Sequence, residues 1–483
     1  MGHKLKSPKI VWIFGLLATV TAIVIPLILF IPKESQASDN PFAGLPVRKP
    51  HTDHKDLLAG PYETGSDVTR ACLECHQEAA YEVMQTVHWT WESQPYLLPD
   101  REEPVTIGKK NSFNNYCIGI QSNWPSCTSC HAGYGWFDAN FDFSNQENVD
   151  CLVCHDQSGV YAKSKSGLPA EGVDLAVAAQ SVALPNRENC GVCHFNGGGG
   201  NAVKHGDMDQ HLYFPTDNTD VHMGRYDFVC TDCHQAQDHN VKGRAISVSM
   251  DLENQVTCTD CHTQDLHPDQ RINAHLSTVA CQTCHIPSGS TKDPTKMYWD
   301  WSTAGQDLPE DSHVYLKIKG SFVYEGDFTP EYYWYKGVAD RYLFGDQLDP
   351  DGVTAINTLA GDINDAEAKI MPFKVHRGKQ PYDLVYNYLL QPQTAGEQGF
   401  WSTFDWESAL RLGAEASGLP YSGEYGFAET EMYWSLSHLV QPVEKSLQCA
   451  DCHGENGRLD WQALGYYGDP IKWGGRLKTG LKP

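Results

Sequence analysis

The sequence predicts a mainly α-helical protein with extensive loops and little sheet, and three observations lead to this expectation. A five-residue pattern of two cysteines and a histidine recurs eight times, at spacings too irregular for a solenoid. Between the seventh and eighth copies, residues 286–448 lack the pattern and carry many aromatic side chains. The 483-residue chain is also acidic, with a formal net charge of −25.

The recurring pattern is C-x-x-C-H, the attachment signature of c-type haem. On a helical turn the two sulfurs lie on one side and can form thioethers with the haem vinyl groups, and the histidine faces the iron. Zinc sites and thioredoxin-like pairs also use C-x-x-C, but neither requires a following histidine. Histidine is 21 of 483 residues, so eight matches in eight copies are not chance. The attachment residues are Cys72, Cys75 and His76; Cys127, Cys130 and His131; Cys151, Cys154 and His155; Cys190, Cys193 and His194; Cys230, Cys233 and His234; Cys258, Cys261 and His262; Cys281, Cys284 and His285; and Cys449, Cys452 and His453.

Eight covalent haems would supply much of the core, because each macrocycle is a large apolar plate. The sequence therefore predicts a multihaem cytochrome c architecture with a haem-packed core, long loops and modest helix content. The acidic charge excludes nucleic acid as a partner. An anionic substrate would be repelled by the average surface, so a site for one needs local positive charge.

The N-terminal residues 1–38 are predicted to be a signal or membrane anchor with a cleavage-like region. Basic residues precede an apolar run over 11–31 that is long enough to span a bilayer. Ser35-Gln36-Ala37 is similar to a cleavage site. The anchored alternative is slightly favoured over the cleaved one, and both predict export to the periplasm, with a possible tether to the cytoplasmic membrane.

The rest of the chain is expected in three parts. Residues 39–285 form the haem-bearing region with haems 1 to 7, beginning with a helix capped by Ser66 or Asp67. Residues 286–448 form an inserted haem-free scaffold with some hairpins and a few helices. Residues 449–483 hold haem 8 and a short tail.

Electron-transfer haems usually have a second axial ligand, and twelve histidines beyond His3 lie outside the motifs. His88 is twelve residues after His76, about 18 Å along a helix, so it is expected to serve a neighbouring haem. His267 follows His262 too closely to reach the opposite face of the same iron. Such exchange between haems would pack them edge to edge.

Three stretches give the chain a specific resemblance. These are NNYC at 114–117, CGVCHFNGGGGNAVKHGD at 190–207 and HRGKQPYD at 376–383. Together they resemble the octahaem tetrathionate reductase family of periplasmic multihaem cytochromes, over most of the chain from His51 to His453.

The resemblance implies a catalytic second haem, held by Cys127, Cys130 and His131. It implies a lysine as the distal ligand, matched by Lys204, and a distal pocket lined by Asn114 and Cys117. The other haems would be ligated by two histidines each, with His205 and His376 near the active site. The seven distal histidines assigned in this way are His54, His88, His222, His239, His267, His275 and His438.

Cys117 is the one cysteine of 17 outside the motifs. An isolated cysteine is ordinarily a small buried hydrophobe, but a thiol beside a haem can attack or orient a sulfur–sulfur bond. Lys204 would otherwise be a solvated lysine after a flexible glycine loop, and as a ligand it must be a neutral amine. Lys109 and Lys110 would either supply positive charge for an anion or form a solvated face.

These expectations favour a reductase. Electrons would enter at a peripheral haem from a quinol dehydrogenase or small cytochrome and reach the second haem. There tetrathionate would be cleaved to two thiosulfates, with nitrite and hydroxylamine as further candidate substrates. The alternative is a non-catalytic electron conduit, which needs eight doubly ligated irons and has no use for Asn114 and Cys117.

Overall fold

The computed structural model describes residues 20–21, 51–98, 101–115, 119–244, 254–262 and 267–476. By internal contacts the chain divides into the units Met1–Arg48 and Lys49–Pro483, and the fold described below is that of the second unit. The predicted anchor over 11–31 lies outside the described residues, apart from Val20 and Thr21, and so does Cys117. Within the described ranges, every helix is too short or too polar to cross a bilayer.

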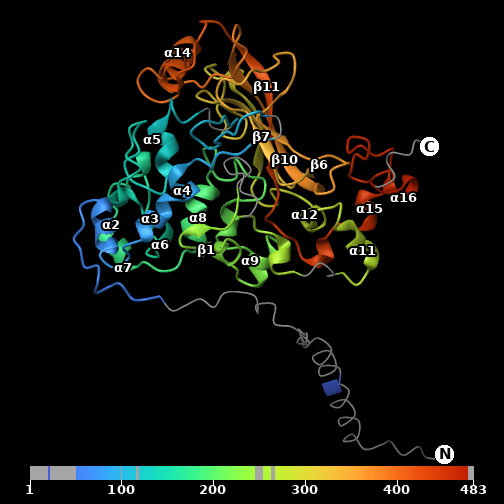
Figure 1. Cartoon of the computed structure of the whole chain (residues 1–483), viewed down its shortest axis with the longest axis horizontal. Helices are drawn as coiled ribbons and strands as arrows, with labels where there is room; N and C mark the ends of the chain where they lie inside the picture. Colours follow the sequence, from blue (N-terminus) through green and yellow to red (C-terminus); the bar gives the residue numbers. More distant parts are fainter. Residues whose placement is uncertain are drawn as a thin grey trace, which may run out of the picture. The chain divides into compact units, whose positions relative to one another are not determined.

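The haem-bearing region is built from short helices and loops (Figure 1). In most motifs the cysteines and histidine lie on or beside one helical turn, which brings the two sulfurs to the same side. Its α-helices are α2 Gly65–Leu73, α3 Ala79–Met84, α4 Val87–Thr90, α5 Trp124–Cys127, α6 Leu152–His155, α7 Leu175–Gln180, α8 Arg187–His194, α9 Val221–Arg225, α10 Cys230–Cys233, α11 Gln270–His275 and α12 Cys281–His285. The 3-10 turns are η1 Thr128–Cys130, η2 Gln146–Asn148, η3 Lys165–Gly167, η4 Gln210–Leu212 and η5 Cys258–Asp260, and a small ribbon pairs β1 Ala236–Gln237 with β2 Asn240–Val241.

Helix α2 begins earlier than expected. Its N-cap is Thr64, whose hydroxyl accepts a hydrogen bond from the Asp67 N–H, while the Asp67 carboxylate accepts one from the Thr64 N–H. The predicted cap at Ser66 or Asp67 was therefore wrong, because Asp67 occupies the N3 position of a capping box whose N-cap is Thr64. Two short helices, α3 and α4, follow in place of a continuation, and Trp91 ends α4 in the left-handed conformation with a φ of 52°.

The scaffold between the seventh and eighth motifs contains a seven-stranded sheet. Strands β10 and β11 form its long antiparallel pair, from Phe373 opposite Ser435 to Asp383 opposite Tyr425. The order is β4-β5-β3-β10-β11-β8, with β6 also pairing with β10. The strands of this sheet are β3 Thr295–Asp300, β4 Tyr315–Leu316, β5 Gly320–Glu325, β6 Glu331–Tyr335, β8 Thr354–Ala355, β10 Lys369–Asp383 and β11 Tyr425–Ser435; β7 Ala339–Arg341 pairs with β9 Asn357–Leu359. The remaining elements are η6 Trp301–Thr303, α13 Phe400–Thr403, α14 Trp406–Ser417, η7 Val443–Lys445, α15 Cys449–Cys452 and α16 Pro470–Trp473.

The expectation of little sheet holds for the described haem-bearing region but underestimates the scaffold. The protein is 27% helical and 18% strand. Strand β10 explains the difference, because its buried positions include Lys374, His376 and Gln380. A strand with buried polar residues lacks the apolar alternation by which strands are recognised in a sequence.

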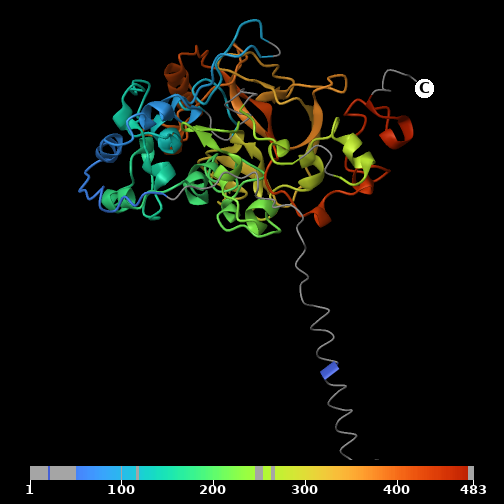
Figure 2. The ribbon, with the colours of Figure 1, turned by 60° about the horizontal axis from the view of Figure 1, so that its bottom comes forward.

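The largest hydrophobic cluster packs on this sheet and joins it to the haem-bearing region. Trp299, Phe373 and Trp434 of the sheet belong to the same cluster as Phe113 and Val203, which lie near the two segments predicted to form the active site. The eighth motif, on α15, returns beside α11 and α12 in both views of the fold (Figures 1 and 2). The Leu447 N–H donates to the carbonyl of Cys284 there.

Candidate functional site

Seven of the eight motif histidines face a second histidine ring. The ring centres of each pair are 6.1 to 6.4 Å apart. In every pair the second ring comes from another part of the chain, not from the same motif. The pairs are His54–His76, His88–His194, His155–His239, His222–His262, His234–His438, His267–His285 and His275–His453.

This separation is what a metal ion between two imidazoles requires. A metal–imidazole nitrogen bond is about 2 Å long, and the ring centre lies about 1.1 Å beyond the nitrogen, so two rings on opposite sides of one ion have centres about 6.2 Å apart. Ordinary ring pairs in proteins have centres about 4.5 to 7 Å apart. Here seven pairs, each with one motif histidine, share one narrow separation that matches the metal geometry, so the residues present fit an iron held between each pair.

The hydrogen bonds of these rings support the same assignment. In eight of the fourteen paired histidines the Nδ1 atom is within 3.2 Å of an oxygen acceptor, which leaves Nε2 to face the partner ring. Metal-bound histidines commonly use the second nitrogen in this way to fix the ring. The eight are His54, His155, His234, His239, His267, His275, His438 and His453.

His131, of the second motif, is the exception. Its backbone N–H donates to the carbonyl of Thr128, three residues back, whereas the N–H of His76 or His155 donates to the first cysteine of its own motif. Among the described residues, the rings around His131 are those of Trp89, Trp91, Trp136, Phe141 and Phe143, and no histidine is among them. Its Nε2 is 2.8 Å from the carbonyl of Trp89. Burial lowers the pKa of His131 to about 3.

The cysteines of different motifs lie next to one another. The cysteines of motifs 1 and 3, 2 and 4, 4 and 5, and 6 and 7 lie close enough to shift one another's pKa strongly. Motifs 3 and 4, 5 and 6, and 7 and 8 are near enough for their sulfurs to interact electrostatically. The attachment points therefore follow one line, 1-3-4-5-6-7-8, with motif 2 beside motif 4.

The segment that carries Lys204 is held against the sheet. Thr295 of β3 donates its hydroxyl to the carbonyl of Ala202 at 2.7 Å, and Lys374 of β10 donates to the carbonyls of Val203 and Lys204, each at 3.0 Å. The Lys204 side chain lies over Trp434, with Nζ 4.7 Å from the ring centroid. The ring of His205 is 5.1 Å from the same Trp434.

The segment that carries Asn114 is held by the same strand. The Asn115 amide donates to the carbonyl of His376 at 3.1 Å, and the buried Arg341 donates to the carbonyl of Phe113 at 3.0 Å. Since Lys374 and His376 are two residues apart on β10, the two predicted active-site segments converge on one short stretch of sheet. The structure thus brings the neighbourhoods of Lys204, His205, His376 and Asn114 together.

Lys109 and Lys110, predicted to supply positive charge or to form a solvated face, lie beside the second motif. Lys109 lies over Trp91 with Nζ 4.3 Å from the ring centroid. Lys110 forms a 3.0 Å ion pair with Glu92 and lies over Phe143. Both are half-buried rather than a solvated face, and both help to lower the pKa of His131.

The site contains a concentration of buried basic residues that the sequence did not reveal. Lys296 and Lys374 are almost fully buried, and burial, then the charges of Lys319 and Lys374, lowers the pKa of Lys296 to about 6. Burial and these lysines also hold the pKa of His376 well below its usual range. Lysines look solvated in a sequence, and the one available signal was that Lys374 lies two residues before the HRGKQPYD stretch.

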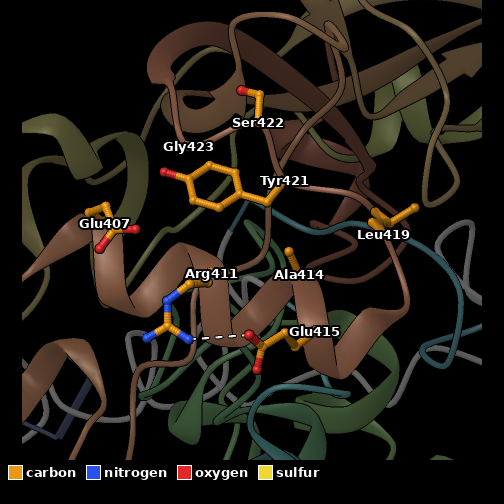
Figure 3. Close-up of a pocket in the computed structure, with 8 residues that line it drawn as sticks. All are labelled: Glu407, Arg411, Ala414, Glu415, Leu419, Tyr421, Ser422 and Gly423. Carbon is orange, nitrogen blue, oxygen red and sulfur yellow. Dashed lines mark hydrogen bonds and ion pairs between the residues drawn. The ribbon is translucent and has the colours of Figure 1, made fainter.

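A separate hollow of about 300 Å³ lies between α14 and the segment 419–423 that precedes β11 (Figure 3). Glu407, Tyr421 and an ion pair between Arg411 and Glu415, 3.2 Å long, line it. None of the predicted site residues contributes to it, so it is not the site inferred from the sequence.

The attachment motifs and the paired rings define a c-type cytochrome with several haems. A family model described as "Cytochrome c bacterial" matches residues 296–456, and one described as "Cytochrome c7 and related cytochrome c" matches residues 216–286. The solved octaheme cytochrome c from Shewanella oneidensis is 50% identical, with a TM-score of 0.83, and the match covers 87% of this chain and 98% of that one. An uncharacterized protein of Archaeoglobus fulgidus is 22% identical over 238 residues, which are 39% of this chain and 79% of that protein. The chain belongs to the octahaem c-type cytochrome family, and its haems are covalently bound.

Proposed function

We propose that this protein is an exported octahaem reductase that reduces tetrathionate to thiosulfate at its second haem. Seven haems, each held between two histidines, would carry electrons. The remaining one, the second haem, which is attached through Cys127 and Cys130, would be the catalytic haem. Lys204 would be its distal ligand and would be displaced by substrate. Nitrite and hydroxylamine are further substrates of the same proposal.

The observation that carries the proposal is the contrast between His131 and the other motif histidines. Seven of them have a second histidine at the distance that an iron requires, and His131 has none among the described residues. A pure electron conduit gains nothing from one differently ligated haem. A reductase needs one, because substrate has to reach the iron.

A group of buried basic residues supports an anionic substrate. Burial and the nearby charge of Lys374 lower the pKa of both Lys296 and His376, and Lys319 adds to the effect on Lys296. A dianion beside them would favour their protonated forms, so the group becomes positively charged when the anion binds. It also stabilises the two thiosulfate dianions that tetrathionate forms when it accepts two electrons.

The residues of the chain have separate roles in this proposal. The buried basic residues described above bind the dianion. Asn114 hydrogen-bonds its oxygens, and the Cys117 thiol orients the central sulfur–sulfur bond. Bound haem supplies the electrons singly, and two of them convert one tetrathionate into two thiosulfates without a proton. The adjacent attachment points of motifs 2 and 4 support entry of these electrons by way of the fourth haem.

The family supports a periplasmic or extracellular protein, since c-type haems are attached outside the cytoplasm. A quinol dehydrogenase or small cytochrome would supply the electrons. A membrane tether through 11–31 is part of the proposal that protease sensitivity and detergent extraction would test.

The test is reduction of tetrathionate by the haem-loaded protein with reduced viologen as donor. Cys117→Ser and Cys117→Ala should retain the haem content and lower kcat by about a hundredfold, because a misplaced bond reacts slowly. A rate unchanged in both variants would limit Cys117 to packing. The absence of turnover with tetrathionate, nitrite and hydroxylamine would leave the conduit as the better description.

A further inference from the structure

Lys374 is a fully buried lysine whose ammonium group has a complete set of acceptors. Its Nζ donates to the carbonyls of Val203 and Lys204, each at 3.0 Å, and to the hydroxyl oxygen of Thr295. An ammonium has three N–H donors, so these three oxygens use all of them. Burial lowers the pKa of Lys374, and hydrogen bonds to three oxygens offset the cost of burying its charge.

The side chain of Lys204 contacts the sheet at the same position as its backbone carbonyl. Lys374 on β10 is directly opposite Trp434 on β11. The Nζ of Lys204 is 4.7 Å from the Trp434 ring centroid. One rung of the ladder therefore fixes both the backbone carbonyl of Lys204 and the aromatic surface against which its side chain lies.

We propose that Lys374 is a positioning residue, which acts as a built-in cation that fixes the peptide of Lys204 and thereby delivers the Lys204 amine to the second haem. This inference rests on the proposed role of Lys204 as distal ligand. It assigns to Lys374 no contact with substrate or with the haem.

The physical reason lies in the three oxygens that converge on one point. Two carbonyls and a hydroxyl oxygen have partial negative charges that repel one another, and a cation between them turns that repulsion into attraction. Without the ammonium, the carbonyls of Val203 and Lys204 would lose their buried donor. Thr295 would still donate to Ala202, so the loosened part of the segment would be Val203 and Lys204.

Lys296 offers a matched control. It is also a buried lysine, on the neighbouring strand β3, and its Nζ lies 3.5 Å from the ring centroid of Trp299 and 3.6 Å from that of Phe322. Its replacement removes a buried lysine side chain from the same region but none of the hydrogen bonds that hold the Val203 and Lys204 carbonyls. A general effect of losing a buried lysine on the stability of this region would appear in both variants.

The experiment measures cyanide binding to the oxidised, haem-loaded, full-length protein by visible spectroscopy, together with the haem content. Lys204→Met removes the competing amine and should tighten cyanide binding at one haem. Lys374→Met and Thr295→Val should tighten it about tenfold, because a poorly held lysine competes less well. Lys296→Met should change it by less than about twofold, within the scatter expected for mutations without shared contacts.

The outcomes separate the two proposals. If Lys204→Met tightens cyanide binding but Lys374→Met and Thr295→Val behave like Lys296→Met, the positioning role is overturned while the lysine ligand stands. If Lys204→Met has no effect, Lys204 is not the ligand and both proposals are overturned. Thr295→Val, which keeps the side-chain shape, gives the answer if Lys374→Met does not fold.

Discussion

The acceptor at the Nδ1 atom differs from one paired histidine to the next. Backbone carbonyls serve His155 and His234, whereas carboxylates serve His239, His438 and His453. Although burial alone would lower it, the Asp207 carboxylate raises the pKa of His438 to about 9. A carboxylate makes the imidazole a stronger donor and favours ferric over ferrous iron.

We predict that Asp469→Asn raises the reduction potential of the eighth haem. The Asp469 carboxylate is 2.7 Å from Nδ1 of His453, and its removal withdraws negative charge from the ferric state. The expected shift is on the order of 60 mV, which is about tenfold in a one-electron equilibrium. Asp460→Asn is the control, because Asp460 accepts from Gln462 and Ala463 instead. Equal shifts in the two variants, measured by film voltammetry, would contradict the assignment.

Site residues that belong to a short motif could be predicted from the sequence, whereas those placed by distant contacts could not. The haem-attachment residues could be recognised, because each set of three lies within five residues. The approach of His88 to His194 depends on the turn at Trp91 and on distant packing, so spacing alone predicted only that His88 would serve another haem. Lys374 could not be recognised, because nothing local distinguishes a buried lysine from a solvated one.

At the scale of elements, strand β10 organises the candidate site. Its middle holds the Lys204 and Asn115 segments, and its end is fixed by Asp383. The buried Asp383 carboxylate accepts hydrogen bonds from the backbone N–H groups of Val385, Tyr386 and Ser422. Although burial opposes it, these bonds lower the pKa of Asp383.

We predict that Asp383→Asn destabilises the protein by about 1 to 3 kcal/mol at pH 7, the typical cost of losing a charged hydrogen-bond acceptor. A carboxyl group whose folded pKa is lowered stabilises the fold above its unfolded pKa of about 3.9 and loses that contribution as the pH falls through the folded pKa. The difference in the free energy of unfolding between the two proteins should therefore shrink between pH 5 and about pH 2. Urea unfolding across this range measures it, and a difference independent of pH would contradict the role of the charge.

The same strand marks the limit of what could be predicted about the fold. The short helices of the haem-bearing region follow from the motifs, whose cysteines need a helical turn. The extent of the sheet did not follow, because Lys374, His376 and Gln380 occupy buried positions of β10 where apolar residues are expected. Lys374 and His376 of this stretch contact the Lys204 and Asn115 segments, so residues that hold the candidate site also obscure the strand pattern in the sequence.

At the scale of the whole molecule, the order of the attachment points suggests how electrons travel. The line 1-3-4-5-6-7-8 leaves motif 2 as a branch beside motif 4. A catalytic haem on a branch can be supplied from either end of the line. This arrangement fits the proposal that one haem is ligated differently from the other seven, which are alike.

The most direct test of this account is the number of haems that accept an added ligand. The oxidised, haem-loaded protein is titrated with cyanide, and the spectral change is compared with the total haem content from the pyridine haemochrome. The account predicts eight haems, of which one binds cyanide while the seven with two histidines remain unchanged. Binding at no haem would leave a closed electron conduit, and binding at several would contradict the seven histidine pairs.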